Sequence, residues 1–242
     1  MRAEKIRSRL RELENPEKAK ILQGFFKTGP GEYGEGDLFL GIPVPQLRKL
    51  SQECDGMALR EAQALLRSRV HEERLLALLI LIRRYAKEGE TGKKNVYGLY
   101  LKNTQWVNNW DLVDLSAPNI VGDFLMNRSK RPLYRLAHSS GLWERRIAIL
   151  STFRFIREGQ FGETLKISRI LLRDDEDLIQ KAVGWMLREV GKRDLSVEES
   201  FLKKHYRQMP RTMLRYAIER FPAARRELYI KGRIGEKRNK KL

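Results

Sequence analysis

The chain has 242 residues, of which 33% are charged, and its 49 Lys and Arg outnumber its 31 Asp and Glu to give a formal net charge of +18. This excess would repel itself in a compact fold unless a polyanion shares the surface, so nucleic acid is the first candidate partner and an anionic membrane surface the second. A membrane-spanning protein is excluded because no apolar run approaches the roughly 20 residues that a spanning helix needs.

The remaining composition narrows the class further. The N-terminus lacks the uninterrupted apolar core of a signal peptide, and Cys54 is the only cysteine, so no disulfide can form within the chain. We therefore expect a soluble protein of the cytoplasm. The length allows one large domain or two small ones, and the high charged fraction favours a single elongated domain over a fully wrapped globule.

The first 28 residues predict two helices. Asn15 followed by Pro16 is typical of a helix start, with the asparagine as cap and the proline in the first turn. Apolar residues recur at helical spacing on both sides of this break. They are Ile6, Leu10 and Leu13 before it, and Ala19, Leu22, Phe25 and Phe26 after it.

A glycine-rich segment follows, from Thr28 to Asp37. Its four glycines and one proline favour a turn or a short hairpin, which would be a small insertion in a helical chain. A phosphate-binding loop is the functional alternative. The segment lacks the Gly-Lys-Ser/Thr ending of such loops and contains three acidic side chains, so an ordinary surface loop or hairpin is the better interpretation.

Helices are expected to continue from there. One begins near Gln46, after two prolines, and ends near Gly56, where another starts and runs to Leu66. His71 then opens a strongly apolar helix that should be buried on most sides.

From this helix onward a pattern repeats. Five residues stand near the starts of apolar helices at intervals of 36, 36, 35 and 34 residues. They are Arg74, Trp110, Arg146, Lys181 and Arg215. Such a period is typical of an all-α helical-repeat solenoid, in which paired helices stack and bury their apolar faces on their neighbours. We expect a curved superhelix with a basic concave face.

The stretch from Asn108 to Pro118 is unusual within this pattern. Asn109 can cap a helix, and Trp110 and Asp114, four residues apart, then project from one face. Counting four residues past each repeat marker gives Leu78, Asp114, Leu150, Trp185 and Glu219. Because burying an unpaired carboxylate would cost several kcal/mol, we expect Asp114 to point into a groove.

The C-terminal third completes the predicted repeats. Ser196 with Glu199 matches a capping box for the last of the helices that lie between the markers. We predict one repeat domain over residues 1–230, and a basic tail over residues 231–242 that adds non-specific phosphate affinity.

Simpler structural interpretations of the same residues compete with a functional site. Taken alone, Trp185 is more often a core residue, and Asp114 is more often a solvated residue or the partner of an arginine. His71, His138 and His205 are about 67 residues apart and match no metal-ligand spacing, so we expect no metal and no cofactor. Dinucleotide, Walker and nucleophile-elbow motifs are absent from the sequence.

Several segments nevertheless resemble one family in order along the chain, the AlkD-like DNA alkylation-repair glycosylases, which are built from HEAT-like helical repeats. The segments are Asn15 to Ala19, Phe39 to Ile42 with Pro45, Trp110 to Asp114, Trp143 with Arg146 to Leu150, and Ile179 to Glu189. Together they extend over about 180 residues, which makes the set specific although no single motif is.

The resemblance implies excision of positively charged alkylated purines, such as 7-methylguanine and 3-methyladenine, from duplex DNA without base flipping. It places the catalytic carboxylate on Asp114, the sugar-facing tryptophans on Trp110 and Trp185, and a DNA-contacting arginine on Arg146. Further candidate DNA contacts are Phe25, Lys181 and Arg188; Arg188, like Arg145, could serve as the phosphate clamp in place of Arg146. We expect the protein to be associated with the nucleoid in the cytoplasm, and we take a monomer as its default oligomeric state.

Two departures keep other functions open. The segment from Thr28 to Asp37 is similar to insertions in branches of the family that bind branched or distorted DNA, and Phe25 stands where the family has a ring with a hydroxyl. A non-catalytic DNA-binding solenoid is therefore the alternative. A scaffold that binds an acidic protein is the third possibility.

Overall fold

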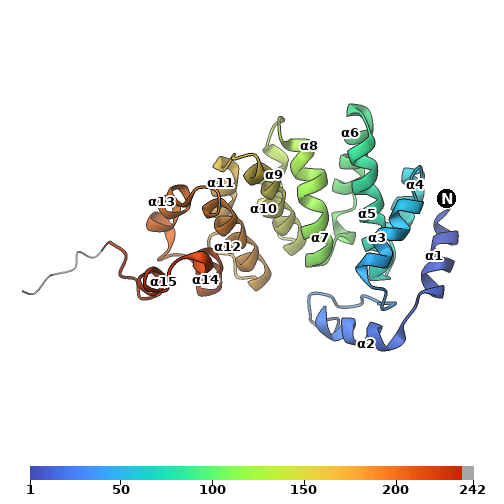
Figure 1. Ribbon diagram of the computed structural model, residues 1–242, viewed down its shortest axis with the longest axis horizontal. Helices are drawn as coiled ribbons and strands as arrows, with labels where there is room; N and C mark the ends of the chain where they lie inside the picture. The colour runs from blue at the N-terminus through green and yellow to red at the C-terminus, as the bar shows by residue number, and fades with distance from the viewer. Residues whose placement is uncertain (236–242) are drawn as a thin grey trace, which may run out of the picture. The chain divides into compact units, whose positions relative to one another are not determined.

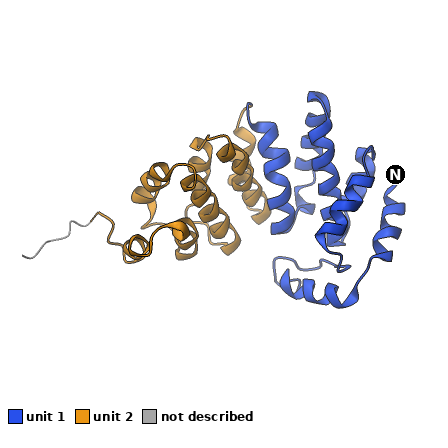
Figure 2. Ribbon diagram, in the orientation of Figure 1, with its two compact units in different colours: residues 1–127 blue, residues 128–242 orange. Residues whose placement is uncertain are grey.

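The computed structural model describes residues 1–235, and over that range the chain is all-helical (Figure 1). The predicted all-α helical-repeat class is confirmed. The one β-type pairing in this range is an isolated parallel bridge between Leu38 and Val70. The chain divides into two compact units, 1–127 and 128–242, and the predicted domain of residues 1–230 extends over parts of both (Figure 2). The predicted tail reaches residues 236–242, which lie outside the described range.

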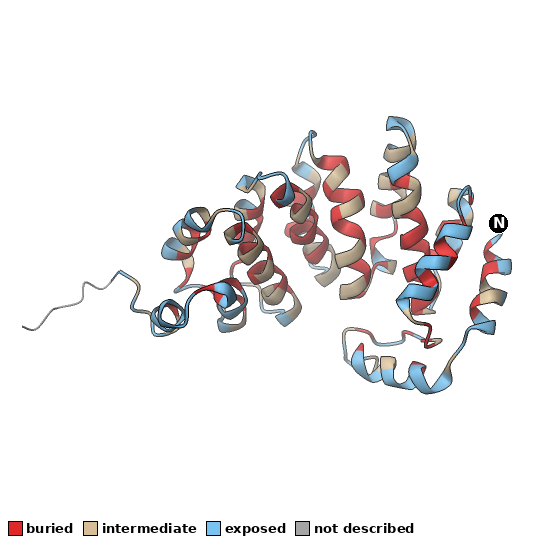
Figure 3. Ribbon diagram, viewed as in Figure 1, coloured by how far each residue is buried: buried red, intermediate tan, exposed pale blue. Residues whose placement is uncertain are grey.

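The first unit is built around one buried helix, α5 (His71–Lys87), which packs against α3, α4, α6 and α7. Every residue from His71 to Leu81 is buried, as its apolar sequence predicts (Figure 3). The other elements are α1 (Ala3–Glu12), α2 (Pro16–Phe25), α3 (Val44–Glu53), α4 (Leu59–Leu66), α6 (Glu90–Leu101), η1 (Thr104–Trp106), α7 (Trp110–Ala117), η2 (Pro118–Gly122) and α8 (Asp123–Leu125).

In the second unit, α10 packs against α12, and α12 packs against α14. The helices between them in the chain fill in beside them: α11 packs against α10 and α12, and α13 packs against α12. The elements are α9 (Arg131–Ala137), α10 (Leu142–Arg157), α11 (Gly162–Ile170), α12 (Asp177–Gly191), α13 (Leu195–His205), α14 (Arg211–Ala217), η3 (Ile218–Arg220) and α15 (Ala223–Ile230).

The repeat predicted from spacing matches the helices. The five markers fall, in order, in α5, α7, α10, α12 and α14, and at least one further helix separates each from the next. The curvature and the basic concave face expected of such a stack stay predictions.

Local signals at helix starts were mostly read correctly. The side chain of Asn15 accepts a hydrogen bond from the N–H of Lys18 at 3.0 Å and so caps α2 as expected. Helix α3 begins at Val44, two residues before the predicted start, because Pro45 fits the first turn of a helix, where no N–H is needed.

One predicted cap is wrong. Helix α13 is capped by Asp194, whose carboxylate accepts hydrogen bonds from the N–H groups of Ser196 and Val197. Ser196 lies inside the helix and donates its hydroxyl to the same carboxylate. An aspartate and a serine are comparable caps, and the charged group two residues earlier takes the position.

The glycine-rich segment from Thr28 to Asp37 forms a series of turns and no hairpin, which resolves the two predicted options. Its end is tied to the helical core, since the N–H of Leu38 bonds to the carbonyl of Arg69 and the N–H of His71 bonds to the carbonyl of Leu38. The segment is thus anchored next to the first turn of α5.

Candidate nucleic-acid interface

Helix α7 begins as its sequence predicts. Asn109 is fully buried, and its side chain accepts a hydrogen bond from the N–H of Trp110 at 2.8 Å. Asp111, in the first turn, accepts one from the N–H of Leu112. Negative charge is favourable at this end of a helix, where backbone N–H groups have no helical partner.

Proline ends the α-helical part of this segment. Pro118 has no N–H to bond the carbonyl of Asp114 four residues earlier, and the chain passes through the π turn η2 before α8. The amide of Asn119 donates to the carbonyl of Leu115 at 2.7 Å and so satisfies one displaced acceptor. Asp114 therefore lies one turn before a local break in the helix.

Trp110 is the partly exposed end of an aromatic cluster in the first unit. Its ring stacks on Phe26 at a centroid distance of 5.2 Å and meets Phe25 edge-on at 5.9 Å. Phe26 is buried with Phe39 and Ala19, whereas Phe25 is 61% exposed. The structure thus brings two predicted site residues, Trp110 and Phe25, into contact, with one of them presented to solvent.

Asp114 is neither fully buried nor fully exposed, although the equivalent residues in α5 and α10, Leu78 and Leu150, are fully buried. It lies near Tyr100, whose pKa is raised by burial and also by the negative charge of Asp114. The hydroxyl of Tyr100 is 2.9 Å from that of Ser116, which ties α6 to α7. The carboxylate is therefore held on a well-anchored helix with access to solvent.

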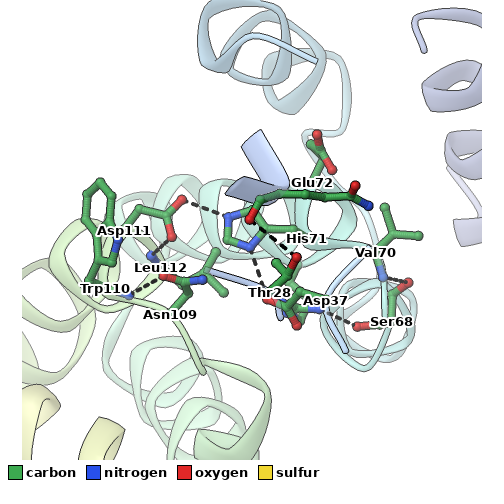
Figure 4. Close-up of polar contacts among 12 residues, drawn as sticks. Thr28, Asp37, Ser68, Val70, His71, Glu72, Asn109, Trp110, Asp111 and Leu112 are labelled. Carbon is green, nitrogen blue, oxygen red and sulfur yellow. Dashed lines mark hydrogen bonds and ion pairs between the residues drawn. The ribbon is translucent and has the colours of Figure 1, made fainter. Parts of the chain in front are cut away.

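A buried charged cluster lies under this helix (Figure 4). The Nε2 atom of His71 is 2.9 Å from Asp111 Oδ2, and its Nδ1 atom is 3.5 Å from Asp37 Oδ2. Arg74, 1% exposed, donates to Asp37 at 2.6 Å and to the carbonyl of Ser68. Burial opposes ionisation of Asp37, but the interaction with His71 and the charge of Arg74 hold the pKa of Asp37 below its usual value.

The two glutamates between His71 and Arg74 are also structural. Glu72 accepts hydrogen bonds from the N–H groups of Leu40, Gly41 and Ile42 at 3.0, 2.8 and 3.3 Å. Glu73 pairs with Arg7 of α1 at 2.9 Å. The first turn of α5 thus fixes α1, α7 and the chain on either side of the glycine-rich segment.

In the second unit, Arg146 is 5% exposed and donates from Nη1 to the carbonyl of Leu178 in the first turn of α12. The other sequence candidate beside it, Arg145, bonds Asp174 at 2.7 Å and the carbonyls of Ser139 and Ser140. Both arginines therefore hold helix ends together in this unit.

Trp185 is partly exposed on α12, and its Nε1–H donates to Glu189 at 3.0 Å. Its ring lies 5.8 Å from that of Phe153, over which the guanidinium of Arg157 is placed at 4.3 Å. This cluster joins aromatic faces to a cation, a combination that suits a sugar-phosphate chain.

The two remaining candidates lie on the same helix as Trp185. Lys181 pairs with Asp177 at 2.6 Å, one turn earlier, and its side chain is 39% exposed. Arg188 pairs with Glu219. The Lys181 pair is on the surface, where the energy of an ion pair is small, so a phosphate can compete for this cation. The side chain of Arg188 is only 16% exposed, so it is less accessible.

Within residues 1–235, no group of three or more His, Cys, Asp or Glu side chains is arranged to hold a metal ion. No helix in the same range is long and apolar enough to cross a bilayer.

Comparison with known proteins identifies the family. The family model described as DNA alkylation repair enzyme matches residues 6–221. The chain belongs to this family.

Solved structures support the fold of this repair family. A predicted DNA alkylation repair enzyme from Enterococcus faecalis superposes with a TM-score of 0.66 at 19% identity, covering 87% of this chain and 97% of its own. The smu.31 protein of Streptococcus mutans UA159 gives a TM-score of 0.51 at 17% identity, covering 72% of this chain and 89% of its own. No curated protein matches the sequence.

The structure adds residues that sequence reasoning had left aside. The sequence places His71 at the start of an apolar helix and excludes it as a metal ligand, but does not predict its contacts with Asp111 and Asp37. The signal that could have placed it is its position one residue after Val70, which forms the isolated bridge, at the start of the most buried helix. Phe26 belongs to an apolar pattern and Phe39 to a family-like segment, whereas no sequence signal singles out Phe153.

Proposed function

We propose that this member of the DNA alkylation repair family is a monofunctional DNA N-glycosylase. Its substrates would be positively charged alkylated purines, such as 7-methylguanine and 3-methyladenine, in duplex DNA. The observation that carries the proposal is the presentation of Trp110 and Asp114 together on α7, with the aromatic and the carboxylate both partly exposed in a chain of net charge +18.

The chemistry needs little more than a fixed anion. Alkylation makes the purine cationic, so when the C1′–N bond breaks the electron pair leaves with a neutral base and no general acid is required. The deoxyribose becomes oxocarbenium-like, and a carboxylate close to it stabilises the positive charge as it forms. Asp114 would supply that carboxylate and orient the water that attacks C1′.

Aromatic faces would hold the sugar and its backbone. Trp110, backed by Phe26, and Trp185, beside Phe153, offer electron-rich faces that favour a nearby cation. Phe25 would touch DNA through its exposed ring. In this proposal the lesion stays stacked and is approached through its backbone, so no pocket for an extruded base is needed.

Positively charged side chains would fix the position of the protein along the duplex by contacting phosphates. Lys181 is the candidate with a surface ion pair that a phosphate can replace, and Arg188 is a second candidate with less exposure. Arg146 would contribute from a buried position, so its contact would depend on the small exposed part of the guanidinium. The proposed setting is the nucleoid of the cytoplasm, with the chain acting as a monomer.

The test is single-turnover release of 7-methylguanine from methylated duplex DNA by the wild type and by Asp114→Asn. If the carboxylate stabilises the sugar cation, the substitution lowers the release rate by roughly 100-fold or more, as for other lost electrostatic contacts to a transition state. DNA affinity changes little because the amide keeps the shape of the side chain.

Asp55→Asn is the matched control, since Asp55 is an exposed carboxylate paired with Arg83 and Lys87. Its release rate should equal that of the wild type. An unchanged rate in Asp114→Asn, with release by the wild type intact, removes Asp114 from the mechanism.

A second function is favoured by the exposed apolar side chains of α2. Ile21 and Phe25, one turn apart, are 70% and 61% exposed beside the glycine-rich segment. Apolar side chains can wedge between bases and stabilise bent or branched DNA without any chemistry. A gel-shift comparison of junction and linear duplexes, run beside the excision assay, separates this binder from an enzyme: tight junction binding with no base release favours it.

A further inference from the structure

His71 is 2% exposed and its ring faces charge on three sides. Asp111 of α7 lies 2.9 Å from Nε2, and Asp37 of the glycine-rich segment lies 3.5 Å from Nδ1, an ion-pair separation longer than a hydrogen bond. Arg74, one turn along α5, shares the same Asp37 oxygen. One imidazole thus stands between two carboxylates that come from different parts of the chain (Figure 4).

The two carboxylates favour a charged ring. Ionised carboxylates only accept hydrogen bonds, and a neutral imidazole has one N–H, so only the imidazolium can direct an N–H at both partners. Burial and the nearby Arg74 oppose the charge, but Asp111 and Asp37 outweigh them and raise the pKa of His71 above its usual value.

The ring also supports the aromatic cluster. It stacks on Phe39 at 4.6 Å and lies 5.0 Å from Phe26, and Phe26 in turn stacks on Trp110. His71 therefore reaches the start of α7 by two routes. One is the bond to Asp111, which is next to Trp110 in the sequence, and the other is the stack through Phe26.

We infer that His71 is a positioning residue: by bridging Asp111 and Asp37 it fixes the orientation in which α7 presents Trp110 and Asp114. The inference rests on the proposed function for its effect on excision. Its effect on the orientation of α7 is independent of that function.

A second physical consequence concerns the glycine-rich segment. Asp37 is the last residue of that segment, and its carboxylate contacts His71 and Arg74 of α5. The same imidazolium that holds α7 therefore also holds the end of the segment that follows Phe25 and Phe26. Loss of the charge on His71 loosens both sides of the aromatic cluster at once.

Two substitutions separate the two halves of the bridge. In His71→Gln the amide nitrogen can take the place of Nε2 and keep the bond to Asp111, whereas in His71→Asn it can take only the place of Nδ1, on the side of Asp37. We expect His71→Asn to lower the single-turnover excision rate on the order of 10-fold, with DNA affinity nearly unchanged, because small displacements of a reacting group are costly. His71→Gln should retain most of the rate.

The pH dependence provides a further readout. The bridge between Asp111 and Asp37 is complete below the pKa of His71, and one of its two contacts is lost as pH rises through that pKa, because the neutral ring keeps a single N–H. Wild-type excision should therefore decline at alkaline pH, while His71→Gln, which has no titrating ring, lacks this decline. A residue that merely filled space would give two variants with the same pH profile as the wild type.

Nuclear magnetic resonance tests the inference without any enzymatic activity. The chain has three histidines and four tryptophans, so the ring signals of His71 and the indole N–H of Trp110 can be assigned by single substitutions. At pH 6, which is below the usual pKa of a histidine of about 6.5, both ring nitrogens of His71 should be protonated. The Trp110 signal should shift in His71→Asn and stay in place in the control His138→Gln, which changes an exposed histidine of the second unit.

The outcomes are distinguishable. If the wild type releases no base, the proposed function fails, and the Trp110 signal still decides the inference. If that signal and the excision rate are both unchanged in His71→Asn, the inference is overturned. If the His71 variants do not fold, Asp111→Asn replaces them, because it turns one carboxylate oxygen into a donor facing His71 and keeps an acceptor for the N–H of Leu112.

Discussion

Arg74 and Arg146 occupy the same position in two repeats and behave alike. Both are buried, and each donates from Nη1 to a backbone carbonyl, of Ser68 in one case and of Leu178 in the other. A guanidinium with five donors can brace a chain end while its aliphatic part fills the core. At this repeat position arginine is a structural residue first, whatever further contact Arg146 makes with DNA.

The ionisation of Glu198 should make the stability of the fold depend on pH. Its side chain is 2% exposed on α13, and burial, with a smaller effect from Glu199, raises its pKa from 4.5 to about 8. A folded state that holds this proton more tightly than the unfolded state loses stability as pH rises from about 4.5 to about 8. In Glu198→Gln, which copies the protonated acid, this loss is absent.

The measurement is the thermal midpoint of both proteins from pH 5 to pH 9. Relative to the wild type, the variant should gain stability steadily as pH rises and level off above about pH 8. Glu199→Gln is the control, since Glu199 is paired with Arg225 and is less buried. A constant difference between wild type and variant across this range would show that Glu198 does not titrate as inferred.

At the scale of elements, α12 and α14 approach each other most closely at Gly184. A Cβ atom there would lie 2.4 Å from the carbonyl oxygen of Met213 and 2.5 Å from Cβ of Tyr216. Gly184 directly precedes Trp185, so this contact also sets where the indole lies on the surface of the unit.

Gly184→Ala should therefore destabilise the fold by roughly 1–3 kcal/mol, the usual effect of overpacking. Gly98→Ala is the matched control, because Gly98 is also within a helix and a Cβ there meets nothing within 4 Å. The control should gain roughly 0.5–1 kcal/mol from the lower entropy of the unfolded chain. Denaturant unfolding of both variants gives the free energies; equal effects in the two would contradict the close approach.

Elements were predictable where one local signal dominated. Asn15 with Pro16 predicted the start of α2, and the apolar run from Leu75 to Ile82 predicted the burial of α5. Errors arose where two signals lay close together. Asp194 and Ser196 are both suitable caps, and the capping-box pattern with Glu199 points to Ser196 although Asp194 is the cap. Pro45 suggests a break before the helix, but it lies in the first turn of α3.

For the whole molecule, the spacing of 34 to 36 residues predicted the order of the repeats but not the partners of their polar residues. The partner of His71 is 40 residues away in α7, and the partner of Arg146 is 32 residues away in α12. Such pairs depend on which helix faces stack, and a single sequence does not encode that in any local pattern. That Trp110 and Asp114 lie on the same helix could be predicted, because their relation is local to that helix.

The charge of the whole chain leads to the last prediction, on how DNA binding depends on salt. Each phosphate that a Lys or Arg neutralises releases condensed counterions, so log K should fall linearly with log salt at a slope of about −0.9 per contact. With a net charge of +18, we expect the affinity for a plain duplex to fall by about 10³-fold or more between 50 and 200 mM salt. Fluorescence anisotropy with a labelled duplex measures it.

Lys181→Ala should reduce the slope by about 1, since it removes one proposed phosphate contact. Lys87→Ala, which loses a surface lysine paired with Asp55, is the control and should leave the slope unchanged. Binding of DNA that is weak and insensitive to salt would contradict both DNA-based functions. The positive charge would then have to serve an acidic protein partner, and the helical repeats would act as a scaffold.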